Sequence, residues 1–99
     1  MNSLLNICKS LIPDCDKEIE INGTRSINYE LWIKGKKNSY TRVIDLIERR
    51  YDKKLIERFL KCWIIDSLKY QNTINSDAIK SYYKGKTEGY EFIIKHLNN

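Results

Sequence analysis

The chain has 99 residues, of which 41% are hydrophobic and 31% charged, a composition typical of one folded domain rather than of a disordered segment. The formal net charge of +5 is unevenly distributed, because residues 31–61 carry ten basic and four acidic side chains. No run approaches the roughly 18 apolar residues of a membrane-spanning helix, and the first residues lack the basic leader of a signal peptide. We therefore expect a cytoplasmic protein that does not span a membrane.

The cysteines do not indicate a metal site. Cys8, Cys15 and Cys62 are an odd number, no two are spaced as CxxC, and the only histidine is His96. A zinc site therefore lacks both ligands and spacing. We expect reduced thiols, with a Cys8–Cys15 disulfide as the alternative, and neither a metal nor a cofactor.

The N-terminal third predicts a short helix followed by a β-hairpin. Residues 1–12 have a mixed apolar face, and Pro13 disfavours the helical conformation in the residue before it. Residues 17–22 and 26–34 alternate apolar and polar side chains, as strands do, and Asn22-Gly23 suits a tight turn. We favour a hairpin over residues 17–34. A helix that starts at Asn28 is the alternative.

The middle of the chain predicts two helices, at residues 39–51 and 52–69. Ser39 and Asp52 are plausible N-caps, because a side-chain oxygen there can accept a bond from a free amide of the first turn. The first helix is amphipathic, with apolar residues at three-and-four spacing. The second has an apolar face so broad that we expect it to be the central helix, contacted on several sides.

A last helix is predicted at residues 77–97, with Ser76 as its N-cap. Its apolar residues recur at heptad-like intervals, and Lys86 occupies one position of that seam. The apolar members are Ile79, Tyr83, Tyr90, Ile93 and Leu97. Gly85 and Gly89 each cost about 0.8–1 kcal/mol in a helix interior, which indicates either close approach of another backbone or a loop followed by a short strand. We favour the continuous helix.

These elements predict an α+β, mainly α fold for the single domain 1–99: three to four helices with a short N-terminal β-hairpin packed on them. A hairpin is marginal alone and must pack on the helices.

No catalytic motif is present. Gly85-Lys86-Thr87 is similar to the end of a phosphate-binding loop, but the glycine required five residues earlier is replaced by Lys80. Every Asp and Glu has an ordinary explanation as a surface residue, so no carboxylate pair is singled out for catalysis. We therefore expect a protein that is not an enzyme.

The basic residues of the central stretch predict a nucleic-acid-binding surface. Three lysines precede the expected helix N-terminus at Ser39, where free amides favour an anion. A second basic cluster lies at the other end of that helix. The candidate residues are Lys34, Lys36, Lys37, Ser39, Arg42, Arg49, Arg50, Lys53 and Lys54. A helix-turn-helix is the alternative arrangement, but its second helix is too apolar for base reading, so contacts to the DNA or RNA backbone are favoured over sequence-specific base contacts. A solvated basic face that binds no anion is the competing interpretation.

Protein binding is the competing function. Aromatic residues are enriched at interfaces, and the glycine face of the last helix carries several: the candidate interface residues are Tyr82, Tyr83, Gly85, Gly89 and Phe92. The hairpin edge is a second contact surface, and a second copy of the chain is a further candidate partner. In composition, the chain resembles small accessory proteins of phages and other mobile elements, which favours an inhibitor, immunity or accessory role.

Overall fold

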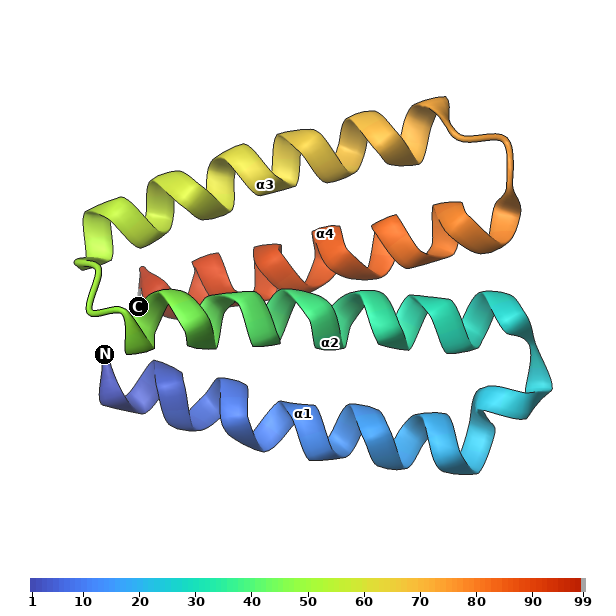
Figure 1. The fold of residues 1–99 in the computed structure, drawn as a ribbon, viewed down its shortest axis with the longest axis horizontal. Coiled ribbons are helices and arrows are strands. Elements are labelled where there is room, and N and C mark those ends of the chain that lie inside the picture. Colours follow the sequence, from blue (N-terminus) through green and yellow to red (C-terminus); the bar gives the residue numbers. More distant parts are fainter. Residues whose placement is uncertain (99) are drawn as a thin grey trace.

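A computed structural model describes residues 1–98, which form four long helices and one short 3-10 turn. The elements are α1 (Asn2–Asn22), η1 (Gly23–Arg25), α2 (Ile27–Glu48), α3 (Lys53–Thr73) and α4 (Asp77–Leu97). Helices α2 and α4 form the central pair, with α1 packed on α2 and α3 packed on α4 at opposite sides (Figure 1). Within residues 1–98, α1 and α3 do not touch.

The predicted hairpin at residues 17–34 is wrong, because this region is helical and no strand occurs in residues 1–98. Helix α1 continues through Pro13 to Asn22. An internal proline costs roughly 3 kcal/mol, and here packing against α2 offsets that cost. The packed side chains repeat at helical spacing on both sides of the proline: Leu4, Cys8, Leu11, Ile12, Cys15 and Ile19.

Helix α2 begins at Ile27, twelve residues before the predicted start at residue 39. The alternative prediction, a helix that starts at Asn28, lies one residue from the observed start. Its N-cap is Ser26, whose hydroxyl accepts a bond from the Tyr29 amide at 3.2 Å. Ser39 is not a cap: it lies in the middle of α2, fully buried, and donates a hydrogen bond to the Lys36 carbonyl oxygen at 2.7 Å.

The other two predicted caps are confirmed. The side chains of Asp52 and Ser76 each accept a hydrogen bond from the backbone amide three residues later, at 2.8 and 3.3 Å. Helices α3 and α4 begin directly after them. Helix α4 has the bounds expected from the sequence and is continuous through its two glycines.

Helix α2 ends earlier than predicted, at Glu48. Arg50 has a positive φ of 64°, the amide of Arg50 bonds to the Ile47 carbonyl and the amide of Tyr51 to the Leu46 carbonyl. This is a Schellman cap, in which glycine is the usual left-handed residue. Because arginine occupies that position, the sequence carries no clear stop signal.

Small residues bring α2 and α4 into close contact. A Cβ atom added to Gly85 would overlap the backbone of Trp32, and one added to Gly35 would overlap the backbone of Tyr82. One added to Gly89 would overlap the Ser39 hydroxyl. The close approach that the glycines suggested is therefore within the chain, between two of its own helices.

The expectation that residues 52–69 form the central helix is also wrong. Helix α3 packs mainly on α4, and its residues Ile56 and Leu60 are fully buried. Its outer face leaves Leu55, Ile65 and Leu68 exposed. None of the helices in the described part of the chain combines the length and apolarity needed to span a membrane.

Candidate functional site

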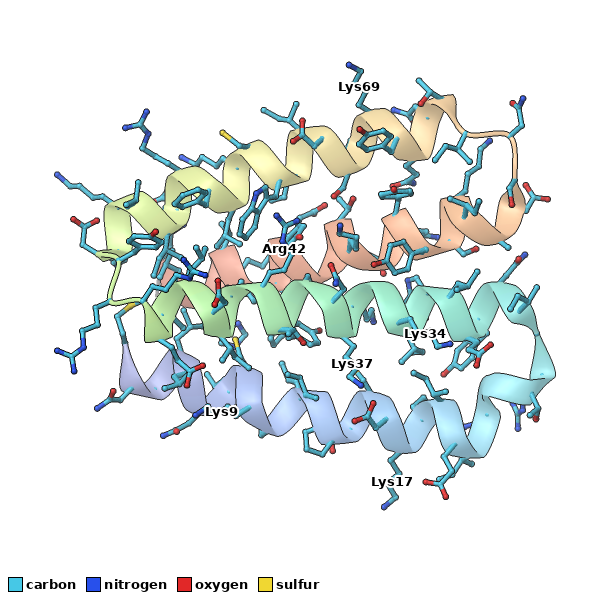
Figure 2. The ribbon with its side chains drawn as sticks, in the orientation of Figure 1. Lys9, Lys17, Lys34, Lys37, Arg42 and Lys69 are labelled. Carbon is cyan, nitrogen blue, oxygen red and sulfur yellow. The ribbon has the colours of Figure 1, made fainter. Side chains whose placement is uncertain are left out.

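The structure divides the predicted basic residues between two sides of α2. Lys34 and Lys37 lie on the side toward α1, whereas Arg42 lies in the gap between α2 and α3 (Figure 2). Lys37 forms an ion pair with Asp16 of α1 at 2.6 Å, and Lys34 pairs with Glu30 one turn earlier at 3.5 Å. Both lysines are in the helix interior, so the free amides of a helix N-terminus are not available beside them.

Lys36 is also committed to an internal contact. Its ammonium group lies 3.7 Å from the centroid of the Trp32 ring, a cation–π geometry. The Trp32 indole nitrogen donates a hydrogen bond to Glu88 of α4 at 2.7 Å. Lys36 and the buried Ser39 therefore contribute to the α2–α4 contact rather than to an open anion site.

The second predicted basic cluster lies at the α2–α3 connection. Arg49 pairs with Asp45 at 3.0 Å and is exposed. Arg50 occupies the left-handed cap position, and Lys53 and Lys54 begin α3, all three exposed. These cations are close together because they are close in sequence, and they lie at the end of the molecule where α2 and α3 are joined (Figure 1).

Arg42 lies on the same face of α2 as Arg49, about 10 Å along the helix axis at ~1.5 Å per residue. Its guanidinium group stacks on the Trp63 ring of α3, 3.7 Å from the centroid, and donates a hydrogen bond to the Tyr90 hydroxyl of α4 at 2.9 Å. Arg42 therefore bridges three helices.

Lys86 of α4 is the second cation at this place. Its ammonium group lies 5.7 Å from the Tyr82 ring and 5.6 Å from the Tyr83 ring. Partial burial, with a smaller contribution from the positive charge of Arg42, lowers the pKa of Lys86 below its ordinary value. Among residues 1–98, no carboxylate forms an ion pair with Arg42 or Lys86.

These two cations border a hollow of about 240 Å³ between α2, α3 and α4. We call it the Arg42–Lys86 hollow. Its other lining residues are Trp63, Asp66, Ser67, Tyr70 and Tyr83. Two unpaired cations beside aromatic walls favour an anionic ligand that also has a planar apolar part.

Aromatic rings extend from the hollow toward the α2–α3 connection. Trp63 contacts Tyr90 and Phe59, each with ring centroids 5.5 Å apart, and Phe59 stacks on Tyr51 at 5.7 Å. Tyr51 lies within the α2–α3 connection, between Arg50 and Lys53. A continuous series of aromatic contacts therefore joins the hollow to the basic connection.

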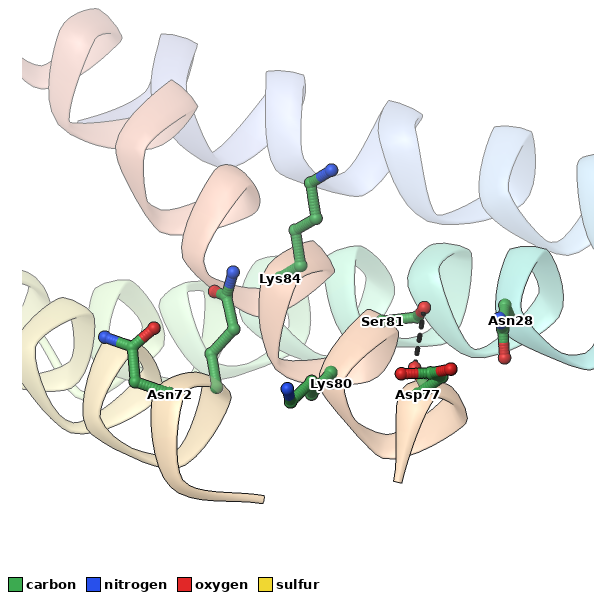
Figure 3. Close-up of a pocket in the computed structure, with 7 residues that line it drawn as sticks. Asn28, Asn72, Asp77, Lys80, Ser81 and Lys84 are labelled. Carbon is green, nitrogen blue, oxygen red and sulfur yellow. Dashed lines mark hydrogen bonds between the residues drawn. The ribbon is translucent and has the colours of Figure 1, made fainter. Parts of the chain in front are cut away.

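A larger hollow of about 410 Å³ lies near the α3–α4 connection, and all of its lining residues have polar side chains (Figure 3). It is lined by Asn28, Gln71, Asn72, Asp77, Lys80, Ser81 and Lys84. Its side chains carry both signs of charge, and the Ser81 hydroxyl bonds back to the Asp77 carbonyl at 3.0 Å. This mixed surface has no aromatic wall and no concentrated charge, so the Arg42–Lys86 hollow is the stronger candidate.

The five residues of the predicted protein interface do not form one surface. Gly85 and Gly89 are buried against α2. Tyr83 lines the Arg42–Lys86 hollow, Tyr82 lies beside Lys34, Lys37 and Asn38 of α2, and Phe92 packs edge-on against Tyr40.

The sequence interpretation did not include Lys86, Trp63 and Tyr70 among the site residues. The available signal was Lys86 itself, a charged residue at an apolar seam position of the last helix. A lysine at an apolar seam position either destabilises the core or lines a polar site, and here Lys86 lines the hollow.

No family model, curated protein or solved structure matches this chain.

Proposed function

We propose that the protein is a small non-enzymatic nucleic-acid-binding protein and that it binds through the Arg42–Lys86 hollow and the basic α2–α3 connection. The observation that supports this proposal most is that Arg42 and Lys86, both partly buried beside aromatic rings, have no carboxylate partner among the described residues. Two like charges at one site repel each other, and a phosphate between them removes that repulsion.

The proposal retains five of the predicted residues, Arg42, Arg49, Arg50, Lys53 and Lys54. It omits Lys34, Lys36 and Lys37, because they neither line the Arg42–Lys86 hollow nor belong to the α2–α3 connection. Backbone phosphates supply most of the affinity of such proteins, and the affinity then falls steeply with salt.

A charge-matched pair of variants tests the proposal. Arg42→Gln/Lys86→Gln and Lys34→Gln/Lys37→Gln each remove two positive charges, so their net charges are equal. We expect the first to weaken binding to labelled DNA or RNA of about 12 nucleotides and to reduce the slope of log affinity against log salt by about 1.4–1.8. The second should leave the slope unchanged.

Urea unfolding of both double variants checks that they are folded. If both lower affinity equally, the effect is net charge alone and the proposed surface is wrong. If the unmodified protein does not bind either nucleic acid at low salt, the function itself is wrong.

A second candidate function is protein binding through the outer face of α3. Leu55, Ile65 and Leu68 are 37%, 66% and 40% exposed there. The same helix carries Lys54, Arg58, Lys61 and Lys69. Because like charges disfavour pairing with a second copy, a partner with an apolar centre and an acidic rim fits this face best.

Exposed isoleucines provide a matched control for this second candidate. Ile65→Glu should abolish capture of such a partner from a nuclease-treated extract of the encoding cells, whereas Ile21→Glu on α1, at a site 61% exposed, should not. A partner retained by both variants does not bind the α3 face.

A further inference from the structure

The Arg42–Lys86 hollow contains an exposed aromatic platform. The rings of Tyr70, near the end of α3, and Tyr83 of α4 are stacked, with centroids 5.2 Å apart and planes 24° apart. Tyr82 meets Tyr83 edge-on at 5.4 Å. Tyr70 remains 50% exposed, so this platform is accessible to solvent and to a ligand.

The aromatic wall of the hollow, which has a volume of about 240 Å³ and is open to solvent, favours unpaired bases. A stacked, paired duplex keeps its bases away from such a surface, because their faces are already covered. An aromatic wall is useful only for a base that has left its stack.

The charges lining the hollow determine how a nucleotide would be oriented in it. Arg42 and Lys86 are the cations of the hollow, and Asp66 is a carboxylate on its lining. A phosphate is attracted to the cations and repelled by Asp66. The base therefore belongs on the α3 side, next to Asp66 and Tyr70, and the phosphate between Arg42 and Lys86.

We propose that the Arg42–Lys86 hollow is a subsite for one unpaired nucleotide, with the base stacked on Tyr70 and its phosphate held by Arg42 and Lys86. This rests on the proposed nucleic-acid-binding function and narrows it to single strands. Affinity then depends on accessible base faces, and sequence preference is weak because every base has a π-face.

A thermodynamic cycle that combines the variant Tyr70→Leu with an oligonucleotide probe lacking bases tests the subsite. Tyr70→Leu keeps an apolar side chain but removes the aromatic face. Because stacking contributes about 1–3 kcal/mol per base, the variant should bind a single-stranded oligonucleotide about 5- to 150-fold more weakly. With a probe of the same length that lacks bases, the loss should be less than about 2-fold.

Phe92→Leu is the matched control, because Phe92 is also partly exposed but contacts Tyr40 and His96 instead of the hollow. It should not change affinity for either probe. Urea unfolding of Tyr70→Leu confirms that the variant is folded.

The outcomes separate the subsite from the function. Equal losses for Tyr70→Leu on the normal and abasic probes, or a duplex bound as tightly as the single strand, overturn the subsite and leave nucleic-acid binding standing. An absence of binding to any probe at low salt overturns both. A large loss confined to the probe with bases supports the subsite.

Discussion

Replacing Gly85 with alanine tests the α2–α4 contact that holds the site together. A Cβ atom there would overlap the Trp32 carbonyl oxygen and lie 2.9 Å from its carbon. Because the obstacle is backbone, the helices must separate, at a cost of up to about 3 kcal/mol. Alanine regains about 1 kcal/mol in helix propensity. We expect a net loss of about 2 kcal/mol in the free energy of unfolding, or about 8–16 °C in melting temperature.

Urea unfolding followed by far-UV circular dichroism measures this change. If Gly85→Ala stabilises the protein by about 1 kcal/mol, helix propensity alone governs the position and the close contact is wrong. Gly23→Ala is the control, because an added Cβ meets side chains rather than backbone: Ile19 at 3.3 Å and Glu30 at 3.6 Å. Its expected change is within about 0.5 kcal/mol.

The second glycine allows the contact to be tested by rescue. A Cβ at Gly89 would overlap the Ser39 hydroxyl and lie 3.0 Å from the Ser39 Cβ, whereas the next atom, the Lys36 Cα, is 3.4 Å away. Ser39→Gly should therefore suppress most of the penalty of Gly89→Ala. Strictly additive effects of the two substitutions would contradict the geometry.

Arg50→Gly should raise the free energy of unfolding by about 0.5–1 kcal/mol, because glycine adopts the φ of 64° without steric cost; a lower urea midpoint would contradict the cap. A thiol reagent at neutral pH should modify the exposed Cys62 in the folded protein and reach the buried Cys8 only after unfolding, as mass spectrometry would detect. Stability should fall between pH 9 and about pH 12, because burial raises the pKa of Cys8 to about 11 and that of Tyr40 to about 12, so the unfolded state loses these protons first. Urea midpoints across that range should decline less steeply for Cys8→Ala/Tyr40→Phe, and identical declines would show that other groups are responsible.

Local chemistry in the sequence was sufficient for part of the fold. Asp52 and Ser76 start helices because each satisfies an amide three residues away, a requirement that needs no tertiary contact. The expected helix at residues 77–97 has the bounds observed for α4. These features depend on neighbours within a few positions, and a sequence contains those neighbours.

The N-terminal third was decided by packing. Residues 17–22 alternate like a strand, but Ile21 ends up 61% exposed while Ile19 packs on the core. What selected the helix was the longer apolar repeat of α1, which crosses Pro13 and docks on α2. A period of two over six residues is weak against a helical repeat of 21 residues once a partner helix is present.

The sequence showed that the candidate site is basic, but the fold decided which residues form it. The cations of residues 34–54 were visible as a cluster, and by itself the sequence determined that this stretch is basic. Only the tertiary structure turned Lys37 toward Asp16 and left Arg42 without a carboxylate partner among the described residues. It also brought Lys86 beside Arg42 from another helix, because the packing of α2 and α3 on α4 selects which faces of a helix meet.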